Sequence, residues 1–166
     1  MQEIWNDIIA PGVLPTSVQF ARLLGAIVFG ALIGFERQMH GRPAGLRTHI
    51  LVCLAAATFA VLSIESVHMR GFEDQQVQID PLRVIEAVTA GVAFLAAGMI
   101  IVSRGRVKGL TTGAGMWLSG GIGLAVGLGH WKTAIFGTIA SIFILYVLGL
   151  IEPKKSSTEK DENPSD

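Results

Sequence analysis

The sequence has few of the residues on which catalytic and disulfide-linked proteins depend. Only one of its 166 residues is a cysteine, and Cys53 lies inside an apolar run, so neither a disulfide framework nor a thiolate zinc cluster is available. Its four histidines are scattered, and it contains no nucleophile elbow, metal-ligand spacing or phosphate-binding loop. We therefore expect a protein that is not an enzyme and that has no metal site and no cofactor.

Charged residues are also scarce. They make up 16% of the chain against 51% hydrophobic residues, which is too apolar for an ordinary water-soluble domain. The formal net charge of +0 gives no indication of nucleic-acid binding. Residues 1–15 carry acidic side chains and no basic n-region, so we expect an external N-terminal segment rather than a cleaved signal peptide.

Five apolar segments of near-membrane-spanning length follow one another along the chain, at about residues 18–35, 49–64, 81–102, 109–129 and 133–151. Asp80 and Pro81 predict the start of the third helix, because aspartate is a favoured N-cap and proline a favoured first residue. The sequence thus predicts an all-α integral membrane protein, with a bundle of about five transmembrane helices over residues 16–151. Residues 152–166 are predicted to be a disordered cytoplasmic tail.

The distribution of lysine and arginine predicts the orientation, because basic residues near helix ends are retained in the cytoplasm. One side of the predicted bundle holds nine of the thirteen: Arg37, Arg42, Arg47, Arg104, Arg106, Lys108, Lys154, Lys155 and Lys160. The other side holds three, namely Arg70, Arg83 and Lys132. We therefore expect the N-terminus outside and the C-terminus inside the cytoplasm.

Small residues recur every four positions on two of the predicted helices. The stripe on the fourth helix is Gly115, Ser119, Gly123 and Gly127, and the stripe on the first is Ala26, Gly30 and Gly34. In lipid, helices associate where small residues let their backbones approach closely. These stripes favour helix pairing over a pore lining, either within one chain or between the copies of a homo-oligomer.

Two ionisable residues, Arg22 and Glu86, are expected at membrane depth, each ~9 Å from the outer end of its helix. An ion pair between them would remove the cost of burying either charge alone. Snorkelling of Arg22 and a proton or cation site are the alternatives. Asp80 and Arg83, at the start of the third helix, are further candidates on this side.

The first loop has the most unusual composition, and its candidate functional residues are Glu36, Arg37, Arg42, Pro43, Gly45, Arg47, Thr48 and His49. Guanidinium groups framed by glycine and proline suit recognition of a phosphate, a membrane lipid head group or an acidic partner. The alternative is a loop whose charges only set the topology. The third loop contributes Lys108, Gly109, Thr111 and Thr112, whose hydroxyls either join the same site or only cap the fourth helix.

Several segments, in order, resemble the MgtC/SapB family: Leu32 to Arg37, Gly41 to His49, Asp80 to Arg83, Val107 to Thr112, and Met116-Trp117. The match covers about residues 20 to 150, the membrane domain of that family without the soluble C-terminal regulatory domain of many members. The resemblance implies a bacterial inner-membrane protein linked to magnesium homeostasis, acid or envelope stress and, in pathogens, virulence. It also implies action on a membrane partner such as the F-type ATP synthase. The alternative function is a small magnesium or proton transporter or channel that uses Glu36, Asp80 and Glu86.

Overall fold

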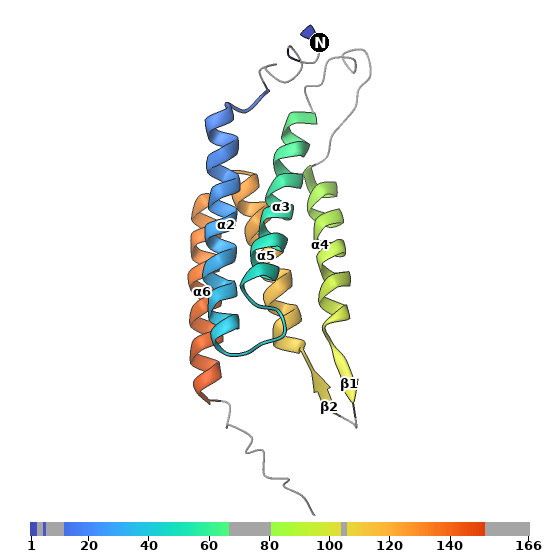
Figure 1. Ribbon diagram of the computed structural model, residues 1–166, viewed down its shortest axis with the longest axis vertical. Coiled ribbons are helices and arrows are strands. Elements are labelled where there is room, and N and C mark those ends of the chain that lie inside the picture. The colour runs from blue at the N-terminus through green and yellow to red at the C-terminus, as the bar shows by residue number, and fades with distance from the viewer. Residues whose placement is uncertain (3–4, 6–11, 67–80, 104–105, 152–166) are drawn as a thin grey trace, which may run out of the picture.

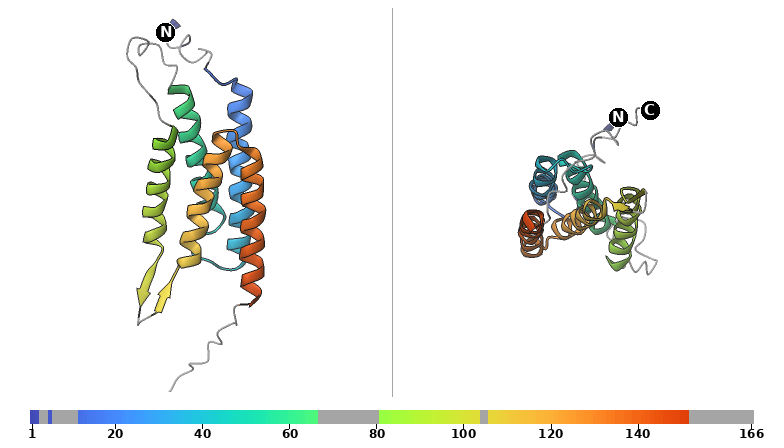
Figure 2. Two further views of the ribbon diagram at one scale, coloured as in Figure 1. Left: turned by 180° about the vertical axis from the view of Figure 1, so that it is seen from behind. Right: turned by 90° about the horizontal axis from the view of Figure 1, so that it is seen from below.

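The computed structural model describes residues 1–2, 5, 12–66, 81–103 and 106–151. Within these ranges, five long helices lie side by side (Figures 1 and 2): α2 (Thr16–Met39), α3 (Leu46–Ser66), α4 (Pro81–Gly98), α5 (Leu110–Gly127) and α6 (Trp131–Ile151). The expected bundle of five helices is confirmed in this part of the chain. Asp80, Arg104 and the tail at 152–166 lie outside the described residues.

A short β-hairpin follows α4, where the sequence predicted a longer helix. α4 ends at Gly98 rather than near Val102, and β1 (Ile101–Ser103) pairs antiparallel with β2 (Arg106–Lys108). Ile101, Val102 and Val107 are β-branched and favour extended backbone. Two residues separate the strands in the sequence, a length typical of hairpin connections. The prediction of an all-α fold was therefore wrong at the hairpin strands, and the prediction that the third helix extends to about Val102 was wrong after Gly98.

α3 packs closely against both α2 and α5. A Cβ atom added at Gly30 of α2 would lie 2.9 Å from the Cα of Ile50 on α3. One added at Gly127 of α5 would lie 2.6 Å from the Cβ of Ala60, also on α3. These spacings leave no room for a side chain, so the structure places both stripes of small residues against α3 within a single chain.

The core lies where α2, α3, α5 and α6 meet. Its buried side chains are mostly small or β-branched: Ala26, Ile33, Cys53, Ala57, Ile122, Val126 and Ala134. Phe29 of α2 and Trp131 of α6 add an edge-to-face aromatic contact with ring centroids 6.4 Å apart. α4 lies at the edge of the bundle and packs mainly on α5 (Figure 2).

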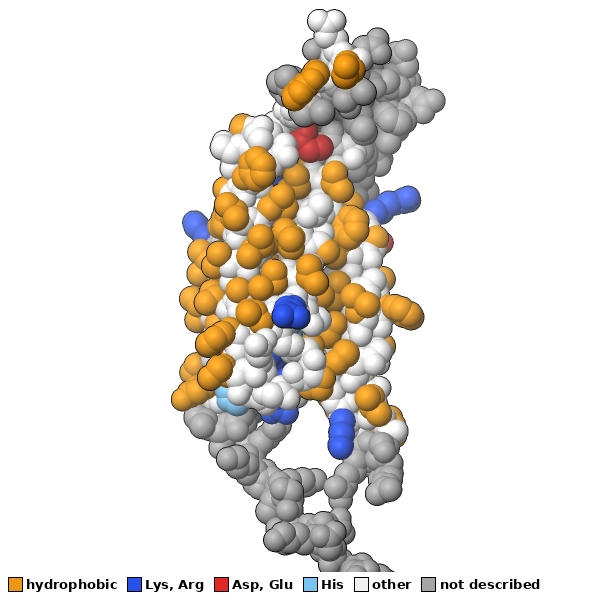
Figure 3. Space-filling view, in the orientation of Figure 1, with side chains coloured by type: hydrophobic (Ala, Val, Ile, Leu, Met, Phe, Trp, Pro, Cys, Tyr) orange, Lys and Arg blue, Asp and Glu red, His pale blue; other side chains and the backbone are white. Residues whose placement is uncertain are grey.

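Apolar side chains are spread over the face of the helices that is seen in Figure 3. On α2 and α6 the large exposed ones include Phe20, Leu24, Val28, Phe35, Phe136, Ile139 and Phe143. α2 and α3 are both long enough and apolar enough to cross a membrane. A surface of this kind matches a hydrocarbon environment, where outward-facing apolar groups carry no solvation cost.

Candidate functional site

The first loop is fixed in place by the way in which α2 ends. Gly41 adopts a left-handed conformation with φ of 61°, and its N–H donates to the carbonyl of Gln38 over 3.1 Å. The N–H of Arg42 donates to the carbonyl of Arg37, also over 3.1 Å. This pair of hydrogen bonds is a Schellman cap, which needs glycine at the left-handed position. The cap turns the chain sharply and fixes the position of the Arg42 backbone.

The start of α3 is tied back to α2 by a single side chain. The Oε1 atom of Gln38 accepts a hydrogen bond from the N–H of Leu46 over 3.2 Å, which satisfies one of the free donors at the helix start. A Cβ at Gly45 would lie 3.2 Å from the same oxygen. Ala44, just before it, is 1% exposed and belongs to the core beside Met116. The loop is therefore packed and hydrogen-bonded rather than free.

Glu36 and Arg37 form a nearly buried ion pair at the end of α2. The Nε and Nη2 atoms of Arg37 donate to the two carboxylate oxygens of Glu36 over 2.6 and 3.1 Å. The exposed fractions of the two side chains are 2% for Arg37 and 9% for Glu36. His40 approaches the same carboxylate, with 3.1 Å between Nδ1 and Oε1. The carboxylate thus orients one guanidinium and holds the last turn of α2 together.

Four buried side-chain nitrogen or oxygen atoms have no hydrogen-bond partner among the described residues. Three of them are Nη1 of Arg37 on α2, Nε2 of His49 on α3 and Oγ of Ser119 on α5, and the fourth is Nε of Arg22. His49 is fully buried, and its Nδ1 lies 2.9 Å from the carbonyl of Gly45, a contact in which Nδ1 carries the proton. Its Nε2 faces α5, where a Cβ at Gly115 would lie 3.3 Å away. The imidazole thus packs tightly against Gly115, and a side chain there would require the ring to shift by a few tenths of an ångström.

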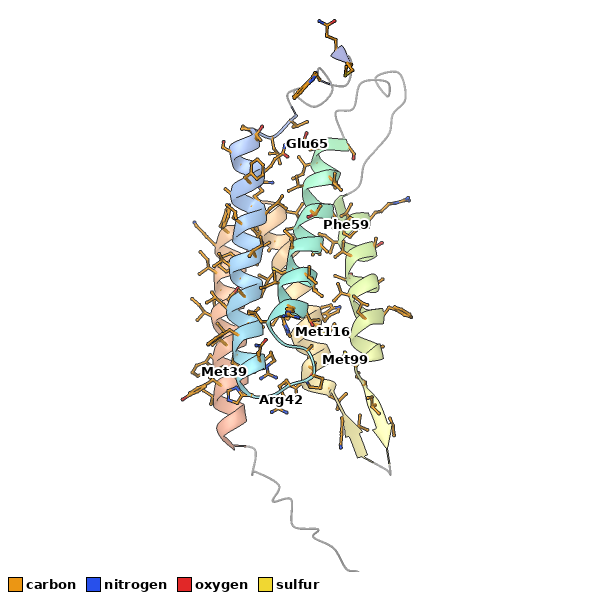
Figure 4. The ribbon with its side chains drawn as sticks, viewed as in Figure 1. Met39, Arg42, Phe59, Glu65, Met99 and Met116 are labelled. Atoms are coloured by element: carbon orange, nitrogen blue, oxygen red, sulfur yellow. The ribbon has the colours of Figure 1, made fainter. Side chains whose placement is uncertain are left out.

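A pocket of about 510 Å³ joins the first and third loops at the same end of the bundle. Its lining combines basic groups, hydroxyls and turn residues: His40, Arg42, Pro43, Lys108, Thr111 and Thr112 among others. Figure 4 shows Arg42 at the end of the bundle that carries the hairpin. The structure therefore brings together the two basic loops, which are more than 60 residues apart in the sequence.

The threonines do not cap α5. The N-cap is Gly109, which has φ of 89° and no side-chain cap bond, and α5 begins at Leu110. Thr111 is exposed and Thr112 is 3% exposed, and both lie in the first turn of α5 against the pocket. A helix start with free N–H groups and no acidic residue has a positive local potential, which adds to the charges of Arg42 and Lys108.

The remaining loop candidates lie outside this pocket. Arg47 is exposed on the first turn of α3, and Thr48 beside it is half-buried. Neither lines the pocket, although both belong to the segment that the sequence singled out. Because Arg42 and Arg47 belong to the same loop segment, the sequence could not show which of them lines the pocket. That depends on the turn at Gly41.

The predicted ion pair between Arg22 and Glu86 is wrong. Nη1 of Arg22 donates to the carbonyl of Gly127 on α5 over 2.7 Å, and Glu86 is exposed on α4. Gly129 follows with φ of 86°, and a Cβ there would lie 2.8 Å from the Arg22 guanidinium. Arg22 therefore satisfies the exposed carbonyl end of α5, where a cation is also favoured by the helix dipole. Arg83 lies at the start of α4 and is exposed.

Sequence analysis assigned no role to Glu65. The carboxylate of Glu65 accepts hydrogen bonds from the N–H groups of Val13 and Leu14, each over 2.9 Å, and from Nε2 of Gln19 over 3.2 Å. It joins the end of α3 to the segment before α2, at the end of the bundle opposite Arg42 (Figure 4). Nothing in the local sequence pairs these distant segments.

Comparison with known proteins places the chain in a family. The family model described as the MgtC family matches residues 23–154. The chain belongs to the MgtC family. It is 40% identical over 129 residues to the protein named putative magnesium transporter YhiD of Escherichia coli (strain K12). The aligned region covers 75% of this chain and 57% of YhiD. No solved structure matches the chain.

Two further relatives extend the likeness across bacteria. Protein SrpB of Synechococcus elongatus is 38% identical over 133 residues, covering 75% of this chain and 71% of SrpB. Protein MgtC of Brucella abortus (strain 2308) is 39% identical over 141 residues, covering 84% of this chain and 53% of MgtC. The chain spans a little over half the length of YhiD and of MgtC. The family resemblance of the sequence is thus confirmed, and the chain is a membrane protein of the MgtC family.

Proposed function

We propose that this chain is a non-enzymatic, multi-pass protein of the bacterial inner membrane that recognises an anionic group of a membrane partner in its basic pocket. The partner is a membrane protein such as the F-type ATP synthase, and the contact contributes to magnesium homeostasis or to acid and envelope stress adaptation. The pocket of about 510 Å³ supports this proposal, because two distant loops supply its basic residues jointly. A loop that only set the topology would need the charges but no shared cavity.

The donors around the pocket suit a phosphate or carboxylate group. Arg42 and Lys108 supply positive charge to the lining, and a guanidinium is the cation whose geometry suits a phosphate or carboxylate. Thr111 adds a hydroxyl, and the start of α5 adds a positive potential. The Schellman cap holds the Arg42 backbone in place, so less conformational entropy is lost when a ligand binds.

The proposed orientation has five membrane crossings, the N-terminus outside and the basic pocket in the cytoplasm. It follows from the excess of basic residues on the pocket side and is consistent with the apolar surface of the helices. A reporter fused after Lys155 should be cytoplasmic, and one inserted near Gln75 should be external. A cytoplasmic Gln75 reporter would mean that the helix count or the orientation is wrong.

Complementation of a null strain under magnesium limitation or acid stress tests the recognition role. Arg42→Lys keeps the positive charge but loses the planar guanidinium that can donate two parallel hydrogen bonds. This variant should therefore fail to restore growth at normal membrane abundance. Arg47→Lys is the matched control, because Arg47 is in the same segment and outside the pocket, and it should restore growth. Full rescue by Arg42→Lys would show that the charges of the loop only set the membrane topology.

Crosslinking identifies the partner more directly. A photoreactive residue in place of the exposed Pro43 would stand at the rim of the pocket. Under stress it should capture a membrane protein through an acidic segment, and the Lys108→Glu exchange should abolish that capture. Capture that persists in Lys108→Glu would place the partner on another surface.

Transport of magnesium or protons is the second candidate function, and the three unpartnered atoms of Arg37, His49 and Ser119 favour it. Such atoms within a bundle can mark the path of an ion or a proton. Of the acidic residues predicted for a transporter, the two that the structure describes lie on different helices, with Glu36 in the last turn of α2 and Glu86 in the second turn of α4. Flux of magnesium or protons through liposomes that contain the purified chain distinguishes this function from partner recognition.

A further inference from the structure

An apolar groove of about 600 Å³ runs between α3 and α4. Its walls are aliphatic and aromatic, with Val52, Ala56, Phe59, Val88, Gly91 and Leu95 among them. Figure 4 shows Phe59 on the side of α3 that faces α4. The groove exists because α4 approaches α5 closely and stays apart from α3. A Cβ at Gly120 of α5 would lie 3.0 Å from Val92, whereas one at Gly91 would meet nothing within 4 Å.

One end of the groove is polar. Ser63 and Ser66 on the last turns of α3 and Arg83 on the first turn of α4 line it there. Arg83 is exposed, and no acidic side chain in the described ranges forms an ion pair with it. The groove therefore combines a long apolar wall with a single cationic end.

The dimensions of the groove match one lipid chain. Its α3 wall extends from Val52 to Ser66, ~21 Å at ~1.5 Å per residue. Half of a hydrocarbon core of ~30 Å is ~15 Å, so the groove spans one leaflet and reaches its head-group level.

We propose that this groove binds an acyl chain of an anionic phospholipid, with the head-group phosphate held by Arg83. The apolar walls take the chain, and Arg83 with the hydroxyl of Ser63 takes the phosphate oxygens, since the hydroxyl of Ser66 already donates to the carbonyl of Leu62. This site is separate from the basic pocket, because α3 and α4 line the groove, whereas the loop after α2, the end of the hairpin and the start of α5 line the pocket.

Native mass spectrometry of the intact chain in mild detergent tests the groove, with phosphatidylglycerol and phosphatidylcholine added in equal amounts. The wild type should retain phosphatidylglycerol in preference to phosphatidylcholine. Gly91→Leu should lose the retained lipid, because its side chain fills the open groove. Gly121→Leu is the matched control: a Cβ at Gly121 also meets nothing within 4 Å, but Gly121 lies outside the groove, so lipid retention should be unchanged.

Removal of the charge tests the polar end. Arg83→Gln should lower the preference for phosphatidylglycerol about fivefold, the value expected for one basic residue at a membrane surface. Lys132→Gln, an exposed basic residue at the start of α6 and outside the groove, should leave the preference unchanged.

Three results would overturn the proposal. The first is wild-type retention of both lipids to the same extent. The second is lipid retention by Gly91→Leu equal to that of Gly121→Leu. The third is a second copy of the chain retained by the wild type and lost in Gly91→Leu, which would make the groove a protein interface. Helical content by circular dichroism, compared across the four variants, separates loss of the site from loss of the fold.

Discussion

Replacement of Gly123 by alanine should destabilise the bundle, whereas the same change two residues earlier, at Gly121, should stabilise it. Both glycines lie within α5. A Cβ at Gly121 would meet nothing within 4 Å, but one at Gly123 would lie 2.9 Å from the Cβ of Ala56 on α3 and closer still to the carbonyl oxygen of Cys53. The two substitutions are chemically identical and differ only in the surface that the methyl group meets.

The magnitude follows from two terms. Ordinary carbon contacts begin near 3.4 Å, so α3 and α5 must separate by at least about 0.5 Å at Ala56 to admit the methyl group of Gly123→Ala. Overpacking of this kind costs ~1–3 kcal/mol. Alanine gains up to ~1 kcal/mol over glycine in helix propensity at either position. That gain cancels between the variants, so their free energies of unfolding should differ by the ~1–3 kcal/mol of overpacking.

Reversible unfolding in mixed micelles, followed by circular dichroism as the denaturing detergent increases, measures the difference. Gly121→Ala should unfold at a higher detergent fraction than the wild type, and Gly123→Ala at a lower one. Equal unfolding curves for the two variants would refute the close approach of α3 and α5. Double replacement with Ala56→Gly should restore part of the stability, since it removes the methyl group that the new side chain meets.

Other perturbations test the two ends of the bundle. Arg22→Leu should lose ~1.5–3 kcal/mol, because it removes a charge-assisted hydrogen bond to the carbonyl of Gly127, whereas Glu86→Leu should stay within ~0.5 kcal/mol of the wild type in the same unfolding assay. Equal losses of unfolding free energy in the two variants would instead support an ion pair between Arg22 and Glu86, which the structure does not contain. Glu65→Gln should raise the amide exchange rate of Leu14 about fivefold, since it replaces a charged acceptor worth ~1 kcal/mol more than a neutral one, and unchanged exchange would show that the N-terminal segment is held by other contacts.

The helices were the predictable part of this fold, because apolar length in lipid leaves few alternatives to a helix. Pro81 begins α4 as expected. The small-residue stripes predicted which faces approach, and the structure adds that both approach α3. That assignment needed three dimensions, since a stripe shows where a neighbour can come close but not which helix it is.

Hydropathy along the chain could not predict the hairpin, and the expected membrane depth of Arg22 could not predict its partner. Val102 extends the apolar run of α4, so hydropathy alone continues the helix, although the β-branched residues on either side of a two-residue connection were a usable signal. Arg22 and Glu86 have matching depths, but depth carries no information about rotation around each helix axis. Arg22 faces α5, and its Nη1 donates to the carbonyl of Gly127 rather than to a carboxylate, while its buried Nε has no partner among the described residues.

The candidate site was predictable in composition but not in shape. The sequence identified both basic loops, and Arg42 and Lys108 do line one pocket. The distinction between Arg42 and Arg47 depends on hydrogen bonds of the Schellman cap, which glycine permits but the sequence does not assign to particular carbonyls. The sequence also did not show that the carboxylate of Glu36 orients the guanidinium of its neighbour, Arg37.

The position of α3 between two glycine-bearing helices has an evolutionary consequence. Cys53 lies under both contacts: its Cβ would be 3.0 Å from a side chain at Gly30, and its carbonyl lies against Gly123. A larger residue on this face of α3 would need compensating changes on two helices at once, so accepted substitutions should be rare there and should arrive in linked sets. The face of α3 toward α4 carries no such restriction, because a change at Phe59 meets an open groove. Sequence divergence among descendants of this chain should therefore accumulate on one side of a single helix and spare the other.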